Sequence, residues 1–169
     1  MTPEVTTAMI RELRDKTGAG IMDAKRALED SDGDSSKAEE LLREKGLASA
    51  AKRAGRAASE GVVESYIHSG GRIGAMIEVN CETDFVARTD DFQGLAKNLA
   101  MQVAAMSPRF VDSESVPEGT DDVKDEELLL EQDYIREPGV KIGELIKQLS
   151  AKTGENIVVS RFSRFELGQ

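Results

Sequence analysis

The sequence predicts an α+β protein, in which a module of three short helices precedes a core of helices packed on an antiparallel three-stranded sheet. Three observations indicate this class. Apolar residues recur at helical spacing through residues 1–46. Two runs rich in β-branched residues, 61–68 and 72–81, flank the turn residues Ser-Gly-Gly at 69–71. The chain then closes on a third such run at 157–165.

These patterns divide the chain into three parts. Residues 1–46 form the N-terminal module, and residues 59–169 form the core. The alanine-rich stretch 47–58 (LASAAKRAGRAA) is predicted to be a linker helix between them. Three helices in so short a segment bury little apolar area, so the module alone has a small margin of stability.

Local signals predict where the three N-terminal helices begin and end. Thr6 caps the first helix, and Gly18 ends it. The second helix breaks at 30–34 (DSDGD), where Asp34 caps the third, and Gly46 is expected to end that helix. The residues expected to face inward are Met9, Ile10 and Leu13 in the first helix, Ile21, Ala24 and Leu28 in the second, and Ala38, Leu41 and Leu42 in the third.

The elements of the core are predicted in the same way. One face of the second strand carries only small or apolar residues: Ile73, Ala75, Ile77, Val79 and Cys81. An amphipathic helix begins near Phe92, with Asp90 as its expected cap. Further helices are expected near 124–134 and 140–153, and Gly154 ends the second of these.

Charge and cysteine usage narrow the class of protein. The net charge is −10, but residues 112–133 contain ten acids and one lysine, so the rest of the chain is close to neutral. Such a run is typical of a solvated loop or face. The single cysteine excludes an internal disulfide framework and suits a reducing compartment. Without a long apolar run or a leader pattern, we expect a cytoplasmic protein that does not enter a membrane.

Residues suited to catalysis are scarce. The one histidine, His68, lies at a predicted strand end, and Cys81 continues an inward-facing strand face. There is no phosphate-binding loop pattern. The run 30–41 departs from a calcium loop at Ser35 and Leu41. We therefore expect no metal, no cofactor and no enzymatic activity.

One basic cluster is the only candidate for contact with nucleic acid. It consists of Lys52, Arg53 and Arg56 and lacks interleaved aromatic residues. A solvated helix face accounts for it better, so we expect no direct binding of nucleic acid.

The stretch 82–87 (ETDFVA) places a phenylalanine among charges. Thr83 can cap a helical turn, which puts Asp84 and Phe85 at its N-terminal corner. Phe85 then either packs inward or projects as an anchor for a partner, and aromatic anchors are typical hot spots. The local pattern alone favours packing inward.

Three blocks of the sequence resemble one family. They are 13–28 (LRDKTGAGIMDAKRAL), 78–87 (EVNCETDFVA) and 154–168 (GENIVVSRFSRFELG), and they resemble elongation factor Ts, the nucleotide-exchange factor of elongation factor Tu. The resemblance implies that Asp84 and Phe85, within the motif Thr83–Val86, enter the GTPase, disturb its Mg²⁺ site and promote release of GDP. It implies binding to both the GDP-bound and the nucleotide-free GTPase, without a cofactor.

The resemblance also implies roles for the other parts of the chain. The N-terminal module resembles a ubiquitin-associated domain and is expected to dock on the GTPase. The residues expected in that contact are Gly18, Gly20, Ile21, Met22 and Lys25. The chain has a single copy of the core, as short family members do, so a homodimer through the core sheet is expected.

Two other functions are compatible with parts of the sequence. A ubiquitin-associated-like adaptor, or another helical protein-binding module, accounts for the three helices but not for Thr83–Val86. A small enzyme would have to use Cys81 or His68.

Overall fold

The computed structural model describes residues 5–169, so the first four residues of the predicted module lie outside the described part of the chain. Helices and strands come in groups along the chain, as is typical of the α+β class, and β1, β2 and the last strand, β5, pair in one sheet. In chain order the elements are α1 (Thr7–Thr17), α2 (Ile21–Asp30), α3 (Ser35–Arg53), β1 (Glu60–Ile67), β2 (Ile73–Cys81), α4 (Asp84–Ala87), α5 (Asp90–Met106), the 3₁₀ turns η1 (Asp125–Glu127) and η2 (Leu129–Glu131), β3 (Asp133–Tyr134), β4 (Glu137–Lys141), α6 (Ile142–Thr153) and β5 (Val158–Glu166).

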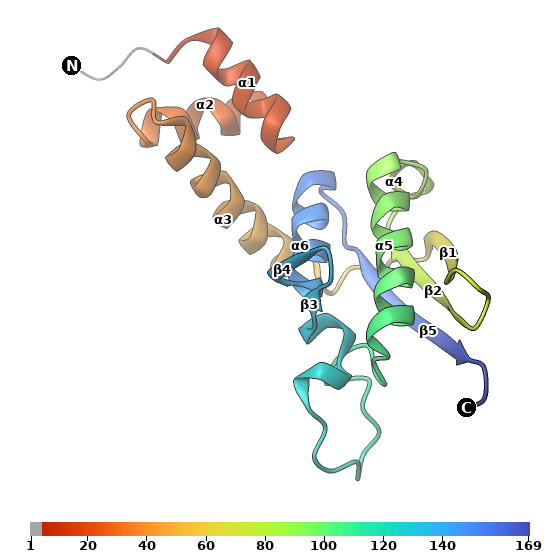
Figure 1. Cartoon of the computed structure of the whole chain (residues 1–169). Coiled ribbons are helices and arrows are strands. Elements are labelled where there is room, and N and C mark those ends of the chain that lie inside the picture. The colour runs from red at the N-terminus through yellow and green to blue at the C-terminus, as the bar shows by residue number, and fades with distance from the viewer. Residues whose placement is uncertain (1–4) are drawn as a thin grey trace.

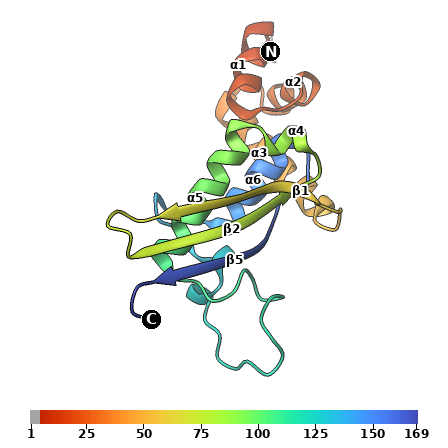
Figure 2. The same cartoon turned by 90° about the vertical axis from the view of Figure 1, so that its right-hand side faces the viewer.

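The core is built in layers on an antiparallel sheet. Its strand order is β1-β2-β5, so the hairpin predicted at 61–81 pairs with the last strand of the chain. Helix α5 packs on the inner face of the sheet. Helix α6 lies on the side of α5 that faces away from the sheet, and α3 runs along α6 (Figure 1). The outer face of the sheet carries none of the described elements and faces the viewer in Figure 2. The predicted fold class is confirmed for the core.

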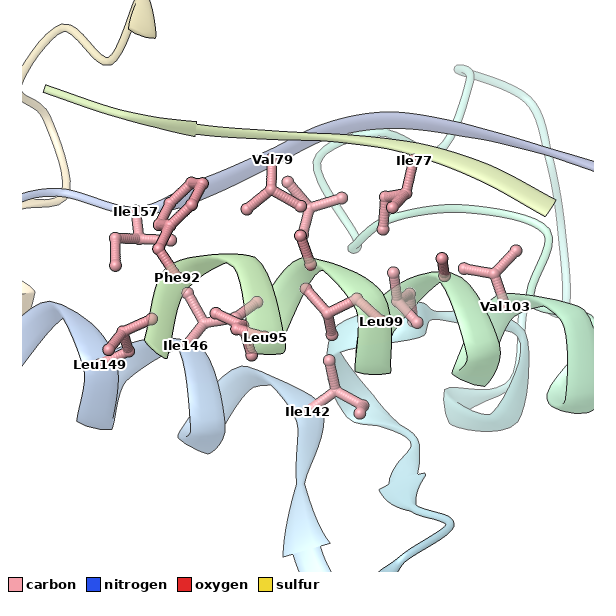
Figure 3. Close-up of a cluster of buried hydrophobic side chains, with 14 of the residues drawn as sticks. Ile77, Val79, Phe92, Leu95, Leu99, Val103, Ile142, Ile146, Leu149 and Ile157 are labelled. Atoms are coloured by element: carbon pink, nitrogen blue, oxygen red, sulfur yellow. The ribbon is translucent and has the colours of Figure 1, made fainter. Parts of the chain in front are cut away.

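The hydrophobic core lies between the sheet, α5 and α6 (Figure 3). Phe92, Leu95 and Leu99 are buried along α5. Ile77, Val79 and Cys81 of β2 face them, as the alternation along that strand predicts. This largely aliphatic core fixes α5 against the end of β2, and the short connection between these two elements contains α4.

Several predicted helix ends are confirmed. The Thr6 and Asp34 side chains accept backbone N–H bonds at the starts of α1 and α3, and Gly18 and Gly154 adopt left-handed conformations at the ends of α1 and α6. The cap predicted for α5 is wrong by one residue. The Thr89 hydroxyl, not Asp90, accepts the N–H of Phe92, and Asp90 lies in the first turn.

Helix α3 does not end at Gly46 as predicted. It continues to Arg53 and includes most of the predicted linker. Gly46 faces α6, where a Cβ atom would lie 2.9 Å from the Ala151 Cβ. The glycine therefore allows two helices to approach closely within a continuous helix, and it does not act as a cap. The division into domains stays a prediction.

The prediction of a helix near 124–134 is also wrong. This segment forms η1, η2 and the start of a small β3–β4 hairpin. The N–H groups of Leu129 and Leu130 donate to the carbonyl oxygens of Phe110 and Val111, so they are unavailable to a helix. Burial of Leu129 in the core favours this pairing over local helical bonds.

Two apolar residues of the module face solvent instead of its interior. Ala24, Leu28 and Ala38 are buried as predicted, but Ile21 is 57% exposed and Leu41 is 39% exposed. Ile21 is the first residue of α2, where the chain leaves the loop after α1. Separately, no helix within residues 5–169 is both long and apolar enough to cross a membrane.

Candidate functional site

The candidate site is the corner where β2 passes into α4. Cys81 ends the strand with its side chain fully buried, and its thiol donates to the Thr83 carbonyl at 3.1 Å. Thr83 has an extended backbone, and its hydroxyl accepts the Val86 N–H at 3.4 Å, so it is the cap that the sequence predicts. The strand thus ends in the core and one helical turn starts at the surface.

Phe85 points away from the protein. It is 78% exposed, the highest value among the large hydrophobic side chains of residues 5–169. Val86 and Ala87 pack against the core, and successive helical residues turn by about 100°, so Phe85 faces solvent. The inward packing that the local pattern favours is therefore wrong.

Asp84 lies beside Phe85 but has a partner on its own turn. Its carboxylate pairs with the Arg88 guanidinium at 2.9 Å, across one turn of helix. Both side chains are partly exposed, so the pair contributes little to stability. The corner therefore presents an apolar ring next to a carboxylate that is accessible to a partner.

The loop before β5 supports this corner. Glu155 accepts hydrogen bonds from the N–H groups of Glu82 and Thr83, at 3.1 and 3.0 Å, and from the Thr83 hydroxyl at 2.6 Å. In return, Glu82 accepts the Asn156 N–H at 2.7 Å. Glu82 also lies 3.6 Å from the Arg56 guanidinium.

The module residues expected to bind a partner lie at the loop between α1 and α2. Gly18 and Gly20 bracket that loop, and Ile21 and Met22 beside it are 57% and 61% exposed. Lys25 follows one turn later and pairs weakly with Glu29 at 3.6 Å. Both views place α2 and α4 at the same end of the molecule (Figures 1 and 2).

A cleft of about 670 Å³ separates this loop from the C-terminal end of α6. Lys152 of α6 spans part of it. A Cβ atom on Gly18 would lie 2.9 Å from the Lys152 Cγ, and the Lys152 ammonium pairs with Asp91 of α5 at 2.7 Å. One side chain therefore contacts the module and the start of α5.

The structure does not bring the two candidate catalytic residues together. Cys81 pairs with Glu60 at one end of the β1–β2 hairpin, and the His68 N–H donates to the Ile73 carbonyl at the other end. At about 3.3 Å per strand residue, the two ends lie roughly 25 Å apart. Burial raises the pKa of the Cys81 thiol to about 11, so little of it is a thiolate at neutral pH. This geometry gives no support to a Cys–His enzyme.

Two members of the basic cluster make contacts within the chain. Arg53 donates to the Ser150 carbonyl at 3.0 Å, and Arg56 lies near Glu82. Lys52 is exposed beside them. These contacts link the end of α3 to α6 and to the site. Arg53 is half-buried there, so the cluster is only in part the solvated helix face that the sequence predicts.

Sequence reasoning missed Glu155 and Lys152. Their partners lie 72 and 61 positions away along the chain or farther, so no local spacing reveals them. The only available signal was the position of Glu155 directly after Gly154, within one of the three blocks that carry the family resemblance.

Comparisons with known proteins agree with that resemblance. A model of the family described as "Elongation factor TS" matches residues 42–127. Elongation factor Ts of Carboxydothermus hydrogenoformans is 47% identical to this chain over 195 residues, covering 98% of this chain and 90% of the relative. The Thermotoga neapolitana protein of the same name is 48% identical, covering 98% of each. That of Anaeromyxobacter dehalogenans is 47% identical, covering 98% of this chain and 90% of the relative.

Proposed function

The chain belongs to the elongation factor Ts family, and on this basis we propose that it is a guanine-nucleotide exchange factor for the translation GTPase elongation factor Tu. It acts by binding the GTPase and promoting release of GDP, and it consumes no nucleotide and needs no cofactor of its own. Its place of action is the cytoplasm, where translation occurs.

The observation that supports a wedge mechanism is the exposure of Phe85. An apolar ring at 78% exposure gains free energy when a partner removes it from water. Burial of the ring in a partner returns roughly 1.5–3 kcal/mol. In this proposal Phe85 inserts between helices of the GTPase, with Asp84 beside it, and displaces groups that hold Mg²⁺. The Mg²⁺ ion supplies much of the counter-charge on the nucleotide phosphates, so its loss weakens GDP binding.

The N-terminal module supplies a second contact in this proposal. Ile21, Met22 and Lys25 dock on the nucleotide domain of the GTPase around the Gly18–Gly20 loop. Two exposed apolar side chains next to a lysine suit a partner surface that is apolar with an acidic rim. Likeness of this module to a ubiquitin-associated domain remains part of the proposal.

Thermodynamic linkage couples the affinity of the GTPase for GDP to its affinity for the exchange factor. A protein that weakens the hold on GDP by a given factor is itself bound more weakly by that factor when GDP is present. The chain therefore binds the nucleotide-free GTPase more tightly than the GDP-bound form. Each 1.4 kcal/mol that reaches the barrier for GDP release changes its rate about tenfold.

We also propose a homodimer through the outer face of the core sheet. Val63, Ile67, Met76 and Phe165 share that face in the strand register, and all four are at least half exposed. An apolar face of this kind on a sheet commonly packs against a second sheet. Two copies would then form a sandwich that carries one site on each side.

Substitution of Phe85 tests the proposed function. Phe85→Ala should lower the stimulated rate of GDP release by about 10- to 100-fold, because the ring contributes roughly 1.5–3 kcal/mol in the complex. Folding should change by no more than about 0.5 kcal/mol, since the side chain lies at the surface. Stopped-flow release of a fluorescent GDP from elongation factor Tu measures the rate.

Met106→Ala provides the control. Met106 is 47% exposed at the opposite end of α5 from α4, so its loss should leave GDP release unchanged. Equal release rates for Phe85→Ala and the unsubstituted chain would contradict the wedge. Absence of any stimulation by the unsubstituted chain would contradict the exchange function as a whole.

A further inference from the structure

The turn that carries Phe85 is too short to hold its own shape. Helix α4 contains four residues, which is a single turn, and a helix of that length does not persist in water by itself. Val86 and Ala87 fix its inner side against the core. The start of α4 determines where Phe85 points, and its position depends on the groups that hold Glu82 and Thr83, the two residues before the helix.

Glu155 holds those two residues. One carboxylate oxygen accepts from the N–H groups of both Glu82 and Thr83, and the other accepts from the Thr83 hydroxyl. Hydrogen bonds to an ionised acceptor are roughly twice as strong as neutral ones. The site is also partly buried, which limits competition from water.

The Thr83 hydroxyl passes this constraint to α4. Because its proton is donated to Glu155 at 2.6 Å, its lone pairs are free to accept the Val86 N–H at the start of the helix. Glu155 therefore orients the cap, and the cap orients the turn that carries Phe85.

Within residues 5–169, the Glu155 side chain differs from those of Glu82 and Asn156, because its hydrogen bonds go only to Glu82 and Thr83. The Glu82 carboxylate also contacts Asn156 and Arg56, and the Asn156 amide donates to two carbonyl groups that follow α3. Those residues join several segments of the fold. All the side-chain hydrogen bonds described for Glu155 go to the turn before Phe85.

We propose that Glu155 is a positioning residue for nucleotide exchange, which fixes the Glu82–Thr83 turn so that α4 presents Phe85 outward in one orientation. This role rests on the proposed exchange function. Without the carboxylate, the turn exchanges its hydrogen bonds for water, and Phe85 reaches its binding geometry in only a fraction of the molecules. The apparent affinity and the exchange rate fall with that fraction.

The first test uses the free chain. In Glu155→Ala, the amide protons of Glu82, Thr83 and Val86 should exchange with solvent at least about tenfold faster, because their bonds or the bonds of their cap are lost. Amides in the middle of α5 should keep their protection. NMR-detected hydrogen exchange gives both values, and unchanged exchange at the turn would overturn the anchoring role.

The second test asks whether Glu155 acts through Phe85. Stimulated GDP release should fall about tenfold in Glu155→Ala. In a Phe85→Ala background the same substitution should cause almost no further loss, since there is no ring left to position. An equal fold-loss in both backgrounds would overturn the proposal, because it would show an effect on folding or on another contact.

Two variants complete the design. Glu144→Ala removes an exposed acid from the first turn of α6 and should leave release unchanged. Glu155→Gln keeps the size and one good acceptor, so it should lie between the unsubstituted chain and Glu155→Ala, and it replaces the alanine variant if that one fails to fold. If the unsubstituted chain does not stimulate GDP release, the exchange function itself is wrong. The effect of Glu155→Ala with and without Phe85 tests the role of Glu155 separately.

Discussion

At the scale of single residues, Cys81 shows how the core controls reactivity. The thiol is fully buried at the end of β2, and burial raises its pKa to about 11. Burial disfavours the charged thiolate because it removes the water that would stabilise the charge. Cys81 is therefore a packing residue, although it lies only four positions before the exposed Phe85.

This burial predicts a pH dependence of stability. The folded pKa is above the ordinary value of 9.0, so the contribution of Cys81 is complete below pH 9 and is lost as pH rises from 9 toward 11. The expected loss across that window is about 2–3 kcal/mol. Urea unfolding at pH 8, 9.5 and 11 should show a steeper decline in the unsubstituted chain than in Cys81→Ala. Parallel declines would contradict the assignment.

Phe85 shows what a local pattern cannot decide. Its exposure follows from the packing of Val86 and Ala87 on side chains of other elements, and those contacts do not appear in the spacing of residues 82–87. The family resemblance, and not the local pattern, predicts a site at Asp84 and Phe85. Glu155 was missed, because a carboxylate that acts across the fold has no local signature.

At the scale of elements, two glycines with opposite environments give a paired prediction. Gly94 lies exposed inside α5, and a Cβ atom there would meet no atom within 4 Å. Gly94→Ala should stabilise the chain by about 0.5–1 kcal/mol, because glycine weakens a helix interior. In β1, Gly61 has φ +147°, and a Cβ atom would lie 2.1 Å from the Val79 carbonyl oxygen.

Gly61→Ala should therefore destabilise the chain by several times the gain at Gly94, about 2 kcal/mol or more. Thermal unfolding of the two variants beside the unsubstituted chain provides the measurement. A loss of stability in Gly94→Ala, or a neutral Gly61→Ala, would show that the local environments of these glycines are wrongly understood.

The elements divide into those fixed by near neighbours and those fixed by distant ones. The caps of α1 and α3 and the stop of α6 depend on residues within one turn, so the sequence was sufficient to predict them. The segment 124–134 depends on bonds to Phe110 and Val111, and α3 passes Gly46 because α6 packs there. Neither partner is visible in a local window, and both predictions were therefore wrong.

At the scale of the whole molecule, the outer face of the sheet is the surface that should govern association. If the proposed sandwich forms, light scattering at micromolar concentration should give twice the chain mass of 18.3 kDa. Phe165→Glu should shift the mass to that of a single chain, because Phe165 is 70% exposed on this face in the monomer and a carboxylate there would be buried without a partner.

Leu41→Glu is the matched control for this experiment. Leu41 is 39% exposed on α3, away from the sheet, so the same charge there should leave the mass unchanged. A single-chain mass for the unsubstituted protein, or a dimer that tolerates Phe165→Glu, would exclude the sheet face as the interface.

The continuous helix α3 has a consequence for how a partner is held. It runs as one helix from the module along α6 of the core, and Gly46 allows the two helices to approach closely. The two surfaces proposed to bind the GTPase, at α2 and at α4, are therefore held at a fixed separation. In the proposed complex, binding of one surface places the other at its contact distance. The second contact then costs little conformational entropy.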